Sequence, residues 1–156
     1  MTFKSAVEAT PDLQGAWRAG LQALRRIDKQ HVDAEDSRRL SGSVDLDSAL
    51  AVKCPYAPRW DYAIGHRPTN ANGEMVYWVE VHPASGAEVG VVLAKLAWLK
   101  QWLQESAPRL QAIRKAFVWI SSGKTSFTLS SPQRKRFALL GLRQRGRLFR
   151  IPNELP

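Results

Sequence analysis

The chain contains 156 residues, 44% of them hydrophobic and 24% charged, and it has a formal net charge of +9 at pH 7. Its length suits one domain with a proper core, so we expect a single domain over residues 1–156. The only cysteine, Cys54, excludes an internal disulfide and a multi-cysteine zinc site. No apolar run approaches the roughly 18 residues of a membrane span, and the first residues lack the apolar core of a secretory signal. We therefore expect a cytoplasmic protein that does not enter a membrane.

Positive charge is concentrated toward the C-terminal end of the chain. Residues 106–153 contain no Asp or Glu, although many Arg and Lys residues lie there. Such a separation of charge favours a polyanionic partner, and nucleic acid is the first candidate. A basic surface that only keeps the protein soluble is the alternative. The residues expected to contact nucleic acid are Lys124, Arg134, Lys135, Arg136, Arg143 and Arg145.

The first third of the chain predicts a helix followed by a strand. Thr10 and Pro11 have the features of a helix start, and apolar residues then recur at spacings of three and four as far as Ile27. Residues 40–50 predict a first strand, with Asp45 and Asp47 on one face. This Asp-x-Asp pair is similar to the metal-binding carboxylates of nucleotidyltransferases, but that family has its Gly-Ser well ahead of the acids.

A hairpin is predicted over residues 60–83. A short strand with Asp61 near its beginning is followed by turn signals, a proline and an Asn-Gly pair, and a second strand extends over residues 75–83. Side chains alternate between the two faces of a strand, so Glu80 and His82 should share one face. We expect Asp61 and Glu80 to lie on neighbouring antiparallel strands.

The second half of the chain alternates helices and strands. Residues 87–103 have the strongest helical pattern, with an apolar core face and a second stripe that contains Lys95. Residues 116–121 form a nearly continuous apolar run, typical of a strand buried on both faces. A serine cap followed by proline predicts a helix over residues 132–145, and a short edge strand is expected at residues 147–152.

This order of elements predicts an α/β (α+β) fold, with a mixed central sheet of about four to five strands flanked by helices. The segments Trp60-Asp61-Tyr62-Ala63-Ile64 and Val79-Glu80-Val81-His82, with the helix and the strand that follow them, resemble the PD-(D/E)xK nuclease superfamily. The resemblance covers residues 40–152 and implies a restriction-endonuclease-like core. Residues 1–36 would then form an N-terminal helix and lead.

The resemblance also implies a chemistry for the site. Two carboxylates suit a hard divalent ion such as Mg²⁺ or Mn²⁺, which activates water and neutralises charge on a phosphodiester. Carried over from the motif, Asp61 and Glu80 bind the ion, and the backbone carbonyl of Val81 is a third ligand. His82 stands where the family has a lysine. An imidazole can accept a proton near pH 7 but lacks a fixed charge, and Lys95 on the following helix is the alternative source of that charge.

The sequence leaves three functions open. The first is a metal-dependent nuclease that acts through Asp61, Glu80, His82 and Lys95, with the basic C-terminal region holding nucleic acid. The second is a catalytically inactive nuclease-fold module that binds nucleic acid without cleaving it. The third is a protein-interaction role, in which the basic surface meets an acidic protein partner.

Overall fold

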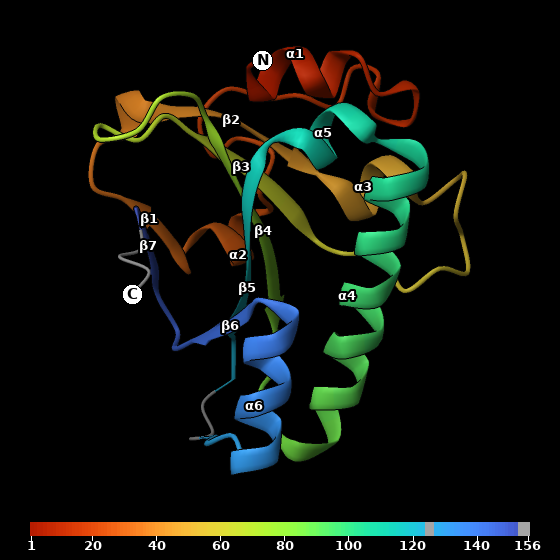
Figure 1. Cartoon of the computed structure of the whole chain (residues 1–156), viewed down its shortest axis with the longest axis vertical. Coiled ribbons are helices and arrows are strands. Elements are labelled where there is room, and N and C mark those ends of the chain that lie inside the picture. The colour runs from red at the N-terminus through yellow and green to blue at the C-terminus, as the bar shows by residue number, and fades with distance from the viewer. Residues whose placement is uncertain (124–126, 153–156) are drawn as a thin grey trace.

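The computed structural model describes residues 1–123 and 127–152, and its centre is a five-stranded mixed sheet (Figure 1). The strands, in their order across the sheet, are β2 (Leu40–Asp45), β3 (Tyr62–His66), β4 (Met75–His82), β5 (Arg114–Ser121) and β6 (Leu142–Arg145). β3 is antiparallel to both of its neighbours, β2 and β4, whereas β5 is parallel to both of its neighbours, β4 and β6. The predicted mixed sheet with flanking helices is confirmed.

Helices cover one face of the sheet (Figure 1). The long helix α4 (Gly86–Ser106) and the short helix α5 (Pro108–Ala112) connect β4 to β5, as the helical pattern at residues 87–103 predicts. α6 (Ser131–Leu140) lies beside α4, and α1 (Phe3–Glu8) packs near α5. No helix within the described ranges is long and apolar enough to cross a membrane. The core on this face includes Phe3, Val76, Trp78, Val92, Leu96, Leu99, Trp119 and Phe137.

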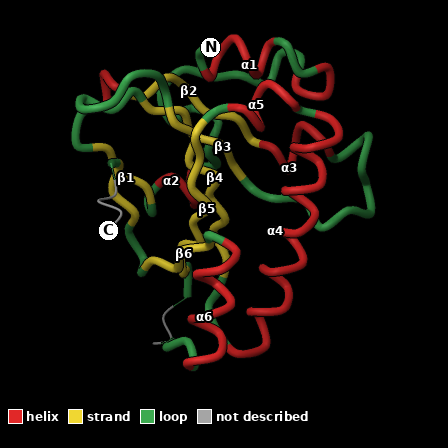
Figure 2. Tube along the Cα trace, in the orientation of Figure 1, coloured by secondary structure: helices red, strands yellow, loops and turns green. Residues whose placement is uncertain are grey.

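A small two-stranded sheet covers the other face (Figure 1 and Figure 2). β1 (Val32–Ala34) pairs in parallel with β7 (Phe149–Ile151), which confirms the predicted final strand. α2 (Arg26–Lys29) precedes β1, and the 3-10 turn η2 (Ser37–Arg39) follows it. The core on this second face includes Tyr62, Ile64, Tyr77, Val79, Val118, Ile120, Phe149 and Ile151.

The central strand β4 divides its side chains between the two cores. Val76 and Trp78 pack on the α4 side, whereas Tyr77 and Val79 pack on the opposite side. Glu80 follows this alternation onto the α4 side, where an apolar residue would be expected. The predicted alternation is confirmed, and it places a carboxylate directly beneath a helix.

The predicted long N-terminal helix is wrong. A 3-10 turn, η1 (Pro11–Leu13), and a series of further turns stand in its place. Gly15 and Gly20 have φ angles of 75° and 52°, a left-handed conformation that interrupts a right-handed helix. The apolar stripe also divides between two cores, because Leu13 is buried on the α4 side and Leu24 on the opposite side.

The first predicted strand, over residues 40–50, ends early. β2 stops at Asp45, and the helix α3 (Leu46–Leu50) follows directly. The Asp45 carboxylate accepts the N–H of Ser48 at 3.0 Å, which caps the first turn of α3. The acid therefore marks the change from strand to helix rather than a position within a strand.

The helix predicted over residues 132–145 is shorter than expected. Ser130 caps α6 through a capping box with Gln133, as its sequence predicts. The helix ends at Leu140 because Gly141 adopts a left-handed φ of 71° at the C-cap. The next four residues form β6 by pairing with β5, a contact that local spacing does not reveal.

Candidate functional site

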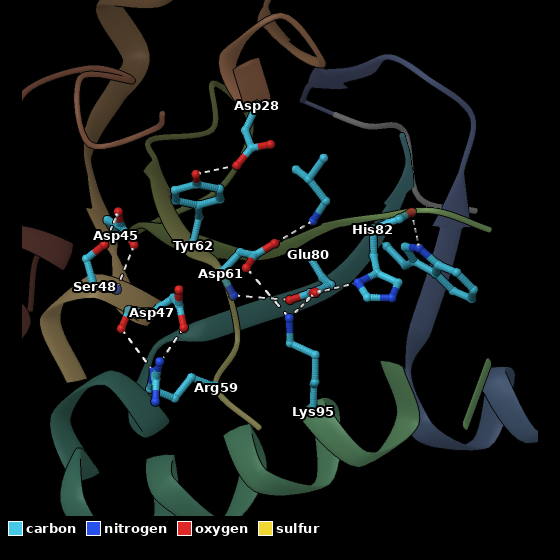
Figure 3. A network of polar contacts seen from close by, with 12 residues as sticks. Asp28, Asp45, Asp47, Ser48, Arg59, Asp61, Tyr62, Glu80, His82 and Lys95 are labelled. Atoms are coloured by element: carbon cyan, nitrogen blue, oxygen red, sulfur yellow. Dashed lines mark hydrogen bonds and ion pairs between the residues drawn. The ribbon is translucent and has the colours of Figure 1, made fainter. Parts of the chain in front are cut away.

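Two acids and a lysine from three separate segments meet at one end of the sheet (Figure 3). Asp61 immediately precedes β3, Glu80 lies near the end of β4, and Lys95 projects from α4. Lys95 Nζ lies 3.6 Å from Asp61 Oδ1 and forms an ion pair with Glu80 Oε2. The antiparallel pairing of β3 with β4 confirms the predicted hairpin, and the structure brings these three predicted site residues together.

Backbone hydrogen bonds fix both carboxylates in place. The N–H of Val81 donates to Asp61 Oδ2 at 3.0 Å, and the N–H of Asp61 donates to Glu80 Oε1 at 3.2 Å. Each acid therefore reaches across to the neighbouring chain segment. The two remaining oxygens, Asp61 Oδ1 and Glu80 Oε2, are the ones that contact Lys95. This reciprocal bonding orients both acids toward one cation.

Burial determines the electrostatics of the cluster. The Glu80 side chain is fully buried, while the side chains of Asp61 and Lys95 are 21% and 15% exposed. Burial and then the charge of Glu80 raise the pKa of Asp61 to about 7, although Lys95 and the Val81 N–H act in the opposite direction. Two carboxylates this close in a buried site require a compensating cation, and Lys95 provides it.

His82 lies at the edge of the same cluster, between two acids. Its Nδ1 is 3.5 Å from Glu80 Oε2, and its Nε2 is 2.5 Å from Oε2 of Glu88, in the first turn of α4. The hydrogen bond with Glu80 raises the pKa of His82, burial lowers it, and Glu88 raises it again, with a net upward shift. Sequence reasoning misses Glu88, whose only signal is its place at the start of the helix that follows His82.

Asp28 is a further acid near Asp61 that sequence reasoning misses. It belongs to α2 and accepts a hydrogen bond of 2.5 Å from the Tyr62 hydroxyl, whose oxygen in turn accepts the N–H of Arg25. The charge of Asp28 makes a small contribution to the raised pKa of Asp61. No local pattern predicts this contact, because Asp28 and Tyr62 are 34 positions apart.

The Asp-x-Asp pair has structural partners. Asp45 caps α3, and Asp47 accepts a hydrogen bond of 2.9 Å from Nε of Arg59. Arg25 approaches both acids, at 3.8 Å from Asp45 and 3.5 Å from Asp47. These arginines and the helix cap already use the two carboxylates, so the geometry gives no support to a nucleotidyltransferase-like metal site here.

The predicted basic residues separate into two groups. Arg134, Lys135 and Arg136 are exposed on α6, the helix whose last residue accepts a hydrogen bond of 2.7 Å from a lysine of α4. Arg143 and Arg145 are partly buried on β6, where strand alternation places them on the face opposite α4. The sixth residue of the prediction, Lys124, lies outside the described residues. The exposed α6 cations are thus the ones on the same face of the sheet as Glu80 and Lys95.

The acid cluster offers two oxygen donors to a divalent ion. Across the described ranges, no group of three or more His, Cys, Asp or Glu side chains is placed to hold a metal. Asp61 and Glu80 nevertheless offer two hard carboxylates, and Mg²⁺ is typically held by one or two carboxylates together with waters and substrate phosphates. Such an ion would share the two carboxylates with Lys95.

Comparisons of this chain with protein families, with curated proteins and with solved structures found no match. Its function is therefore inferred from the geometry of the site.

Proposed function

We propose that this protein is a metal-dependent nuclease with a restriction-endonuclease-like core, in which Asp61 and Glu80 bind Mg²⁺ or Mn²⁺. The observation that carries the proposal is the position of Lys95, which reaches from α4 to both carboxylates. The PD-(D/E)xK pattern combines two acids with a lysine, and this chain has His82 at the lysine position. Lys95 supplies the missing ammonium group from the neighbouring helix.

Each residue of the cluster has a separate role in the proposed phosphodiester hydrolysis. A divalent ion, when bound, would lower the pKa of a coordinated water and stabilise negative charge on the phosphate. The N–H groups of Val81 and Asp61 hold the carboxylates in a fixed orientation, so little reorganisation is needed at the moment of reaction. Lys95 places a positive charge beside the attacked phosphate. His82, held by Glu88, adds a group that can donate or accept a proton.

The exposed cations of α6 supply the contact with the substrate backbone. Arg134, Lys135 and Arg136 lie on the helix that packs beside α4, on the same face of the sheet as the acids. Basic side chains on such a surface bind phosphates without reading sequence. The proposed substrate is therefore a nucleic-acid strand whose phosphates pass from α6 toward Asp61 and Glu80.

The test is a cleavage assay on plasmid DNA, single-stranded DNA and RNA, each with Mg²⁺ or Mn²⁺ and with EDTA. We expect metal-dependent cleavage of at least one substrate, and a loss of about 100-fold or more in Glu80→Gln, because a charged group of the site is removed while the side-chain shape is kept. Glu105→Gln, an exposed change near the end of α4, is the matched control and should retain full activity. Circular dichroism verifies that each variant is folded. Absence of any cleavage that needs both metal and Glu80 would refute the proposal.

One observation favours the inactive nucleic-acid-binding module as a second candidate. Lys95 already neutralises the carboxylates within the protein, so the cluster is electrostatically compensated without a metal ion. Both candidates should bind nucleic acid, and Mn²⁺ binding separates them. The module should bind nucleic acid with a salt slope of about −0.9 per phosphate contact on duplex DNA, as the nuclease also should. Only the nuclease should also bind Mn²⁺, detected by electron paramagnetic resonance, and lose that binding in Glu80→Gln.

A further inference from the structure

A second site lies at the end of β3 and β4 that is remote from Asp61 and Glu80. His66, the last residue of β3, is only 3% exposed and shares its sheet face with Tyr77, whose ring lies 6.2 Å away. Two adjoining pockets of about 290 and 330 Å³ are lined in common by His66, Pro68 and Pro152. These residues lie on the face opposite α4, so the two sites are separated by the sheet and by the length of its strands.

The His66 ring has unused hydrogen-bonding capacity. Among the described residues it forms no hydrogen bond, and its Nδ1 is fully buried without a partner. Burial, with the nearby charges of Arg39 and Arg67, lowers the pKa of His66, so the ring is neutral at pH 7 and offers one donor and one acceptor. Buried polar groups in folded proteins are almost always paired, and one that is not calls for a partner that the described residues do not supply.

Positive charge near His66 is concentrated at the second pocket. Arg39 lines the first pocket, and Arg114 and Lys115 line the second, where the ammonium group of Lys115 already donates to the carbonyl of Gln111. Arg114 is exposed, and its side chain has no hydrogen bond or ion pair within the described part of the chain. The first pocket also has two acids, Glu35 and Asp36, of which Asp36 is paired with Arg38 at 3.0 Å, whereas no acid lines the second pocket among the described residues. Cations near an apolar wall favour a negatively charged ligand.

We propose that these pockets bind a small organic anion, in which a phosphate or carboxylate group contacts Arg39 or Arg114 while an apolar body packs against Pro68, Met75 and Pro152. A polar atom of the ligand next to its apolar body pairs with the ring of His66. Pockets of this size and composition, mostly apolar with a few convergent polar groups, are typical of small-molecule sites. The site is independent of the proposed nuclease activity, because it shares no residue with the acid cluster.

The chain offers a direct probe of the site. It has two methionines, of which Met75 lines the second pocket and Met1 is exposed at the N-terminus. Protein labelled with ¹³C at its methionine methyl groups therefore gives a two-signal spectrum with an internal control. We expect the Met75 signal to shift in a saturable manner on addition of 5′-AMP or benzoate, while the Met1 signal stays constant. Inorganic phosphate alone should bind at least tenfold more weakly than 5′-AMP, because it lacks the body that packs against the apolar wall.

Variants distinguish a specific site from general attraction of anions. His66→Phe keeps an aromatic ring but removes both nitrogens, and it should weaken binding at least tenfold. Arg114→Ala changes an exposed residue that does not endanger folding, and it should also weaken binding, whereas Arg109→Ala, an exposed arginine outside the pockets, should not. Glu80→Gln should bind as the unmodified protein does, which separates this site from the proposed active site. Absence of a saturable Met75 shift, or equal affinities in Arg114→Ala and Arg109→Ala, would overturn the proposal.

Discussion

Replacing Lys95 with methionine tests the electrostatic account of the acid cluster most directly. Methionine keeps most of the side-chain volume but removes the ammonium group that contacts both Asp61 and Glu80. Glu80 is fully buried and Lys95 only 15% exposed, so this is a buried ion pair rather than a surface one. Removing one partner of such a pair leaves an uncompensated buried charge, which typically costs about 3–5 kcal/mol.

The expected result is a large and pH-dependent loss of stability. For a chain of this length about 3–5 kcal/mol corresponds to a fall in Tm of roughly 6–20 °C. The loss should be smaller at pH 5 than at pH 8, because the carboxyl group of Asp61, whose pKa is already raised to about 7, takes up a proton and relieves the repulsion. Urea unfolding at the two pH values measures both effects.

A matched control and a clear contrary result make the test decisive. Lys135→Met changes an exposed lysine of α6 and should alter the free energy of unfolding by no more than about 0.5 kcal/mol. A loss below about 1 kcal/mol in Lys95→Met at pH 8 would mean that the cluster behaves as a solvated surface pair. The assignment of Lys95 as the compensating cation would then be wrong.

Three other predictions follow from the same structure. The pKa of Asp61 is about 7 in the folded state against an ordinary value of 3.8, so the folded state binds this proton more tightly than the unfolded state does. The free energy of unfolding should therefore fall as the pH rises from 3.8 to about 7. Asp61→Asn removes the titrating group and should make this part of the pH profile flatter. Glu88→Gln should lower the pKa of His82, because Glu88 raises it, and NMR titration of the histidine rings measures the change. Gly42→Ala should destabilise the fold by about 2 kcal/mol or more, because Gly42 has a φ of 120° and a Cβ there would collide with the Trp17 indole. Thermal unfolding measures this effect, and an unchanged Tm would contradict the prediction.

The central part of the fold was predictable because its signals are local. The turn residues and the alternation along residues 75–82 define a hairpin and assign Glu80 to one face, and α4 has an apolar stripe more than four turns long. Asp61 and Glu80 could therefore be paired before the structure was known. The sequence left His82 and Lys95 as alternative sources of the positive charge beside these acids. Helical spacing shows which residues share a stripe of α4, but it does not show which stripe faces the end of β4.

The errors of prediction lie where distant contacts decide the structure. The stripe from Leu13 to Leu24 has helical spacing, yet its two ends are buried in different cores, so a single helix cannot satisfy both. β1 exists only through its pairing with β7, more than a hundred residues later in the chain. Strands of three residues gain little stability from the intrinsic β-propensity of their residues, and the local sequence pattern does not indicate which distant segment they pair with.

His82, which stands where the PD-(D/E)xK pattern that the sequence resembles has a lysine, and Lys95 on α4 are two parts of one arrangement. Glu80 and His82 share a face of β4, and a positive group on the strand at residue 82 would compete with Lys95 for the same carboxylate oxygen. The imidazole instead turns its Nε2 to Glu88, at 2.5 Å, and keeps only a longer contact of 3.5 Å with Glu80. The fixed charge therefore comes from α4, and the strand contributes a group whose charge depends on pH. The structure thus keeps two acids and a cation together without a lysine at position 82.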